Sequence, residues 1–472
     1  MSIRGSNSLP LSDDVIEQIF HFLPTFSSLQ STIRVCKAFH RIFNTHPKTI
    51  VRRVAYNVAG PALPQAMRLL RYRTEDDTDS SSSEESVHPD DEVLSDYGPV
   101  SNSAAETTNG PPLTQSETKK LIKIARVASK LEDLFSFRHK NRSSKVNKLA
   151  SMESWRFRRA IYRLMLFSRV FPGSKYGFPS DDEGEDDDDD PDANFKRIRE
   201  DRQARKDFIE DFFTEEILEM YAVTHFLVET AEWVSLAQIG SVGPTYFGDV
   251  ALCAGPGAIL ESYEQGLVIP IQDAAEEMNI VEELIAEYIE HPLCTVLEAT
   301  KTAIPAKDKT LWNKILSSVE GESDVCKRCG AAEGLNLWSE SNWEYLRGVP
   351  TFTINQIHQY LKGLLPQSFT EIAFLRLQLQ PTNQPAPYMN MVAELFDVKR
   401  PEFEDWHKED LLCTSCLKIF IGEHLHLWLL ERKRAAGRQI PEDCWYGYNC
   451  RTQTHRREHA EKLNHLSVPT RG

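Results

Sequence analysis

The chain has 472 residues and a formal net charge of −16 at pH 7, a length that accommodates two or three domains. No apolar run approaches the roughly 18 residues of a membrane span, and no apolar signal segment follows Met1. We therefore expect that the protein does not bind a membrane and that it is located in the nucleus, the cytoplasm or both. The acidity of the whole chain argues against general binding to nucleic acid.

The first predicted elements are two short helices within residues 9–44. Ser12 is placed to cap the first helix, which should end before Pro24. A second helix is predicted from about Ser27, with apolar side chains every three or four positions. Because this unit is too small to bury all of its apolar residues, part of its apolar surface should face a partner.

This pattern resembles the F-box, and the likeness is carried by Leu9-Pro10, the apolar stripe of the first helix and the run V-C-K-A-F at 35–39. The resemblance implies a substrate receptor that docks on the Skp-type adaptor and cullin of a ubiquitin ligase. Ubiquitin transfer would be supplied in trans, so the chain is not expected to be an enzyme. The adaptor-binding residues are expected to be Leu9, Pro10, Ile16, Ile19, Leu23 and Leu29. An ordinary helical hairpin is the alternative.

Changes in composition divide the rest of the chain. Two stretches poor in apolar residues, one containing S-S-S-S-E-E-S and the other an unbroken acidic run at 185–190, predict disordered linkers. The other segments have helical periodicity, which predicts a mainly α, multidomain protein. The expected segments are 1–72 (F-box and following helix), 73–116 (linker), 117–172 (helices), 173–193 (acidic linker), 194–325 (helical body), 326–430 (a zinc-bridged helical module) and 441–472 (a zinc finger).

Four stretches of the body invite functional interpretation. The basic run at 138–148 is predicted to be a solvated loop between helices, with an anion contact as the alternative. The run at 196–206 is either a nuclear import signal or the start of a helix. The glycine-rich stretches at 240–245 and 254–260 lack nucleotide-binding spacing and are interpreted as loops. No nucleophile-elbow, HExxH or kinase motif is present.

Six of the nine cysteines form three close pairs, which is typical of metal binding in a reducing compartment. Cys326/Cys329 and Cys413/Cys416 read C-x2-C…C-x2-C, and each pair can present two sulfurs to one zinc ion. Two metal-free turns, or a site that includes His424 or His426, are the alternatives. On the helix predicted after Cys416, His424 should be a satisfied core histidine and His426 should point away from the apolar face. The single cysteines, Cys36, Cys253 and Cys294, are expected to be core residues.

The tail supplies a second predicted zinc site, for about two zinc ions in all. Cys444, Cys450, His459 and His465 follow the spacing C-x5-C-x8-H-x5-H, and two thiolates with two imidazoles suit tetrahedral zinc. His455 is an alternative third ligand. So short a segment cannot bury a core, so the metal would have to fold it.

The C-x-aromatic-Gly-x-x-C opening, C-R-T-Q and A-x-K-x-N-H make the tail similar to the poly(ADP-ribose)-binding zinc finger. The closest likeness is to the copy in the mitotic checkpoint ubiquitin ligase that carries forkhead-associated and RING domains, and it may continue upstream to Leu411. The resemblance implies that the finger binds poly(ADP-ribose) or proteins modified with it. The expected ADP-ribose-binding residues are Tyr446, Gly447, Tyr448, Arg451, Arg456 and Arg457.

From Glu431 onward, nine basic residues against five acidic ones give a local charge of +4, which suits a polyanion. The sequence therefore predicts an F-box receptor for poly(ADP-ribosyl)ated targets. Two alternatives stay open: a nucleic-acid-binding zinc protein, and an F-box scaffold whose finger is only structural.

Overall fold

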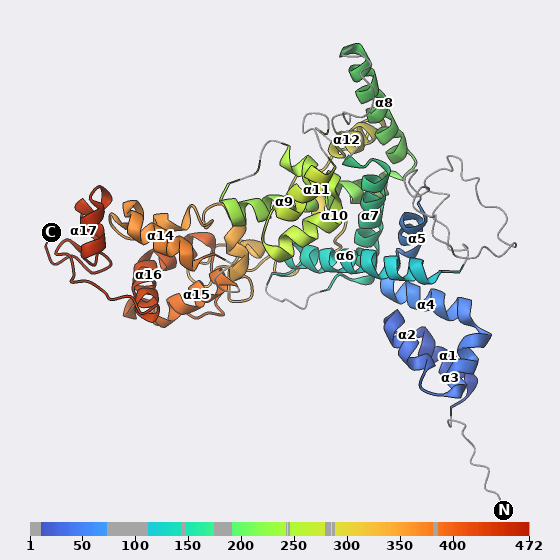
Figure 1. The fold of residues 1–472 in the computed structure, drawn as a ribbon, viewed down its shortest axis with the longest axis horizontal. Helices are drawn as coiled ribbons and strands as arrows, with labels where there is room; N and C mark the ends of the chain where they lie inside the picture. The colour runs from blue at the N-terminus through green and yellow to red at the C-terminus, as the bar shows by residue number, and fades with distance from the viewer. Residues whose placement is uncertain are drawn as a thin grey trace, which may run out of the picture.

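The computed structural model describes residues 11–72, 112–142, 148–173, 191–241, 243, 246–278, 285, 288–380 and 386–471. Within these residues the chain consists of helices, 3-10 turns and irregular segments with no strand, which confirms the predicted mainly α fold. Most of the two expected linkers, at 73–116 and 173–193, lies outside the described residues. Figure 1 shows the helices in three successive groups from the N-terminal to the C-terminal end.

The first group contains a break that the sequence analysis missed. It consists of α1 (Asp13–His21), α2 (Phe26–Ile33), α3 (Lys37–Thr45) and α4 (Pro47–Ala59). Ser12 caps α1 as predicted, its Oγ accepting from Val15 N at 3.4 Å. The single second helix that we predicted is wrong, because extended backbone at Cys36 separates α2 from α3. This break turns Phe39 inward, so its ring lies 5.5 Å from that of Phe20.

These four helices enclose a small core of their own. Its buried members are Ile16, Phe20, Leu29, Phe39, Ile42, Ile50 and Val54. Each large apolar side chain buried in this way contributes roughly 1.5–3 kcal/mol. Helix α5 (Leu63–Arg71), which the sequence analysis grouped with this unit, packs instead against the two helices that follow it.

The second group is the helical body. Its further helices are α6 (Gln115–His139), α7 (Ser151–Val170), α8 (Pro191–Glu210), α9 (Thr214–Ile239), α10 (Phe247–Gln265), α11 (Ile269–Glu277), α12 (Glu290–Ala299) and α13 (Lys309–Trp312). Helix α9 is buried around most of its circumference because α7, α10 and α12 all pack against it. It is therefore the central helix of the body.

Charged side chains lie inside this body, where the sequence predicted a solvated basic loop. Arg138, His139 and Lys140 are buried at the end of α6. Arg138 donates to Thr230 Oγ1 at 2.8 Å and forms an ion pair with Glu229, while Lys140 donates to the buried Glu153 at 2.6 Å. The prediction was wrong for this part of the run because each cation has a partner in the interior. Residues 143–147 lie outside the described residues.

One of the other three stretches of the body differs from expectation. The glycine-rich segment at 254–260 is not a loop but the middle of α10, where Gly255 (φ +88°) forms a kink between two helical halves. The stretch at 240–245 follows α9, which ends at Gly240 in the left-handed region, and several of its residues lie outside the described part of the chain. The basic run at 196–206 is helical and belongs to α8, in which Arg205 donates to Tyr288 O at 2.8 Å.

The third group lies at the end of the molecule away from α1–α4 (Figure 1). Its α-helices are α14 (Phe369–Gln378), α15 (Pro387–Asp397), α16 (Thr414–Ala435) and α17 (Arg457–Lys462). Its 3-10 turns are η3 (Gly334–Asn336), η4 (Trp343–Gly348), η5 (Ile357–Tyr360), η6 (Leu365–Gln367), η7 (Pro401–Phe403), η8 (Gly447–Asn449) and η9 (Thr452–Thr454). Helix α16 is the longest of these elements and connects the two cysteine-containing regions described next.

Candidate functional site

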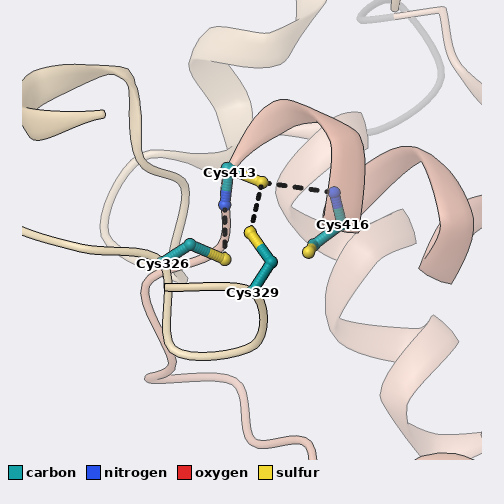
Figure 2. A group of neighbouring side chains, drawn as sticks. All are labelled: Cys326, Cys329, Cys413 and Cys416. Atoms are coloured by element: carbon teal, nitrogen blue, oxygen red, sulfur yellow. Dashed lines mark hydrogen bonds between the residues drawn. The ribbon is translucent and has the colours of Figure 1, made fainter. Parts of the chain in front are cut away.

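The two long-range CxxC pairs meet at one point. Cys326 and Cys329 lie on a turn, whereas Cys413 and Cys416 belong to the start of α16, and their side chains converge (Figure 2). The four sulfur atoms all lie within 4.8 Å of one another, with 3.6 Å between those of Cys329 and Cys413. Four thiolates around tetrahedral zinc have sulfurs about 3.8 Å apart. The cluster could therefore hold a zinc ion.

Backbone contacts hold the two halves of this centre together. Lys327 N donates to Leu411 O at 2.8 Å, and Trp338 and Leu412 exchange two hydrogen bonds. Arg328 adds an ion pair with Asp405 at 2.6 Å and places its guanidinium 4.9 Å above the Trp406 ring. The cysteine turn is thus fixed against the segment that leads into α16.

Amide groups directed at sulfur favour ionisation in this cluster. Cys413 N donates to Cys326 Sγ at 3.2 Å, and Cys416 N donates to Cys413 Sγ at 3.4 Å. Burial opposes ionisation of Cys326, but hydrogen bonds from the backbone at Cys329 and Cys413 outweigh it and lower the pKa of Cys326 to about 6. Burial and the neighbouring thiols raise the pKa of Cys416. A bound cation would be needed to keep all four sulfurs ionised.

The tail forms the second cluster. Ligand atoms of Cys444, Cys450, His459 and His465 lie within 4.8 Å of one another, and His459 Nε2 is 3.3 Å from Cys450 Sγ. His455 is exposed and does not belong to this set. His465 is buried, and its Nε2 has no hydrogen-bond partner among the described residues, as suits a metal ligand. This cluster could also hold zinc.

The finger is docked on α14, α16 and η6. Leu364 N donates to Tyr448 O at 2.7 Å, and α17 packs against α14. The Tyr448 ring also lies 5.7 Å from the ring of His426 on α16. We predicted that His426 would point away from the apolar face; that side of α16 is covered by the finger, so His426 is fully buried. The prediction for His424 is confirmed, since its ring bonds to Phe420 O at 2.6 Å and accepts from Arg400 N at 3.0 Å.

The residues expected to bind ADP-ribose occupy different environments. Tyr446 is 48% exposed, and Arg451, Arg456 and Arg457 are exposed, whereas Tyr448 is half-buried in the contact with α16. Arg456, Arg457 and Lys462 line an open depression of about 580 Å³ beside His459. This arrangement leaves Tyr446 and the arginines accessible to a ligand and uses Tyr448 for docking.

Gly447 is required by the chain's own backbone. Its φ is +43°, and a Cβ at this position would lie 2.2 Å from Ser467 O. The segment 467–471 crosses Gly447 and returns to Trp445, whose carbonyl accepts from Thr470 N at 2.9 Å and Arg471 N at 3.0 Å. The absence of a Cβ at this glycine therefore allows the close approach of residues 467–469.

Trp445 is an exposed aromatic residue that the sequence analysis did not select. Its side chain is 58% exposed, and the Arg471 guanidinium lies 3.8 Å from its ring centre. Its position in the sequence, beside Tyr446 and between the candidate ligands Cys444 and Cys450, could have identified it. The contact between Trp445 and Arg471 could not be predicted from the sequence, because it depends on the path of residues 467–471.

At the N-terminal end, the expected adaptor surface is only partly accessible. Leu9 and Pro10 lie outside the described residues. Ile16 and Leu29 are core residues, and Ile19 and Leu23 are half-buried against them. The large apolar side chains exposed on or beside α1–α3 are instead Leu11, Val15, Phe22 and Val35, of which Phe22 is 76% and Val35 68% exposed. Val15 and Phe22 are seven residues apart, a helical spacing that could have revealed this second stripe.

Comparison with known proteins supports the assignment of the N-terminal helices. The F-box domain family model matches residues 9–50. No curated protein and no solved structure matches the chain. Among the described residues, no helix is both long and apolar enough to cross a membrane.

The chain thus carries an N-terminal F-box domain, a type of domain that binds Skp1-type adaptors of cullin–RING ubiquitin ligases. This supports the role of a substrate receptor in such a ligase. The match ends at residue 50 and does not extend to the body or to the finger.

Proposed function

We propose that this protein is the substrate receptor of a cullin–RING ubiquitin ligase and that its finger selects targets carrying poly(ADP-ribose). The observation that carries the second part is the surface of the finger. Two exposed aromatic side chains, Trp445 and Tyr446, lie on the turn between the candidate ligands Cys444 and Cys450, and the exposed Arg451 directly follows Cys450 in the chain.

The chemistry of ADP-ribose suits this surface. A tyrosine face and a guanidinium, here Tyr446 and Arg451, can enclose a purine, and each stacking contact contributes roughly 1–3 kcal/mol. Arg456 lines the nearby depression and has no carboxylate partner among the described residues, so it is available to a pyrophosphate. Arg457 forms an ion pair with Glu461 at 2.8 Å and contributes less. Zinc would fix the turn and would take no part in binding.

The F-box would supply the link to ubiquitin transfer. The exposed apolar side chains of Val15, Phe22 and Val35 suit burial against an adaptor, which in turn binds the cullin. A reducing compartment, nucleus or cytoplasm, would keep the cysteines able to bind zinc. The body between the F-box and the finger would separate the adaptor from the captured target (Figure 1).

The test uses the full chain in complex with a Skp1-type adaptor. Binding of poly(ADP-ribose) is titrated at rising salt, with single-stranded DNA of matched charge as competitor. Tyr446→Ala should weaken binding by ~10-fold or more, the equivalent of one stacking contact, without loss of zinc. Tyr56→Ala, at a tyrosine 41% exposed on α4, is the matched control and should change nothing.

Three results would oppose the proposal. Equal affinity for DNA and for poly(ADP-ribose) would support a nucleic-acid-binding protein. Binding of neither would leave the finger with a structural role only. Unchanged binding by Tyr446→Ala would show that only the basic tail attracts the polymer.

A further inference from the structure

The finger alone offers few available cations for a polyanion. In the depression beside His459, Arg457 is paired with Glu461, and Glu458 adds an acidic group. Arg456 and Lys462 line the same depression, and in the described part of the chain neither has a carboxylate partner. Two cations suit one pyrophosphate group but not the successive phosphates of a polymer.

The end of α16 and the segment that follows it supply four more basic residues, and most of these are already neutralised. Arg432 pairs with Glu394 at 3.3 Å, Lys433 pairs with the buried Glu371 at 2.6 Å, and Arg434 pairs with Glu431. Arg438 differs from these three. It is exposed, has no carboxylate partner among the described residues, and its guanidinium lies 4.4 Å from the centre of the Phe374 ring on α14.

Arg438 lies at the joint between the finger and the helices that support it. Phe374, on which it stacks, belongs to α14, the helix that packs against α17 of the finger. Figure 1 shows α14, α16 and α17 together at this end of the molecule.

We propose that Arg438, Arg456 and Lys462 form one basic tract across the α14–finger joint that binds the successive phosphates of a poly(ADP-ribose) chain. This inference rests on the proposed function and specifies its ligand as the polymer, with the single ADP-ribose unit held by the finger alone. Stacking on Phe374 holds the Arg438 guanidinium in place, so little side-chain entropy is lost when a phosphate binds.

The test compares Arg438→Gln with Lys418→Gln in the full chain. Lys418 belongs to α16 and lies fifteen residues before Lys433, roughly 22 Å along the helix axis and far from Arg438, which follows the end of that helix. Affinity is measured for ADP-ribose, for a poly(ADP-ribose) chain of defined length and for inorganic polyphosphate. Zinc content and melting temperature are checked for each variant.

Arg438→Gln should weaken binding of the polymer several-fold and reduce the slope of log K against log salt by about 0.7, the value for one lost phosphate contact on a single strand. Affinity for ADP-ribose should stay the same, and Lys418→Gln should leave both affinities unchanged.

Equal effects of Arg438→Gln on ADP-ribose and polymer, or no effect on the polymer, would overturn the inference while leaving the proposed function standing. An equally large loss of polyphosphate binding would overturn the assignment to poly(ADP-ribose), because the tract would then bind any polyanion. Wild-type protein that binds neither ADP-ribose nor the polymer would remove both the inference and the proposed function.

Discussion

At one end of the molecule, seven buried apolar side chains hold α1–α4 together. At the other end lie two candidate zinc clusters of four residues each, one of which brings Cys326 to Cys413, 87 positions later in the chain. The apolar core distributes its stabilisation over many contacts of roughly 1.5–3 kcal/mol each. A zinc site concentrates it in a few bonds. The F-box helices α1–α4 should therefore tolerate single changes that leave their core intact. The module from residue 326 onward should lose its fold when one metal ligand is replaced.

The largest effect is expected from Cys413→Ser. This change removes a candidate zinc ligand, whereas serine can still cap α16, so the loss of metal should unfold the module from residue 326 onward, with a loss of several kcal/mol. Metal analysis should show fewer zinc ions per chain, falling from about two. Adaptor binding is the internal control and should persist, and an intact module in the variant would show that the CxxC pairs need no metal.

A pair of substitutions on α1 tests the other end. Ile16→Asp places a carboxylate in the core and should unfold the hairpin, at a cost of about 3–5 kcal/mol. Phe22→Asp changes a side chain that is 76% exposed, so the fold should survive while co-purification of the adaptor is lost. Ile419→Asp, at an isoleucine 58% exposed on α16, is the matched control. Adaptor binding by Phe22→Asp at wild-type strength would place the contact on another face.

Acid should distinguish the body from the N-terminal helices α1–α3. Burial, opposed by Glu229, lowers the pKa of His139 to about 4, and the ring stacks on Trp312 with 3.9 Å between ring centres. The unfolded chain takes up a proton near pH 6.5 and the folded chain only near pH 4. The free energy of unfolding should therefore fall as the pH drops from 6.5 to 4, by roughly 3 kcal/mol for this residue.

Hydrogen exchange followed by mass spectrometry can measure this pH effect region by region. Exchange in α6 and α9 should accelerate below pH 6.5, after correction for the intrinsic rate, while exchange in α1–α3 should not. His139→Gln should reduce the dependence, and the exposed His40→Gln should leave it unchanged. The same pH dependence in His139→Gln would contradict this assignment.

The smallest effect is expected at Gly447. Alanine there would require a left-handed backbone for a residue with a Cβ and would displace Ser467 O, at a cost of about 2 kcal/mol. Gly437 also has a positive φ, but a Cβ added there would meet no atom within 4 Å, so it is the control for the backbone term alone. The melting temperature of Gly447→Ala should fall further than that of Gly437→Ala, and the difference reports the cost of the contact with Ser467. Equal melting temperatures would mean that residues 467–469 move aside freely.

What could be predicted from the sequence depended on local chemistry. Ser12 indicated the start of α1, and the spacing of Cys326/Cys329 and Cys413/Cys416 indicated two halves of one site, because each signal lies within a few residues. The break at Cys36 has no such signal, since it serves the packing of Phe39 on Phe20. Tertiary contacts also decided the burial of His426 under the finger and of Arg138 beside Glu229, and neither neighbour is near in sequence.

The cysteine cluster also has a consequence for the order in which the chain is made. Cys326 emerges from the ribosome 87 residues before Cys413, and at typical synthesis rates this interval is on the order of ten seconds. During that time the first CxxC pair has only half of its ligand set, and the N-cap of α16 does not yet exist. The nascent chain must therefore protect two thiols from oxidation and from other metals until its second half arrives, so expression under zinc limitation or oxidative stress should reduce the yield of the zinc module before that of the F-box.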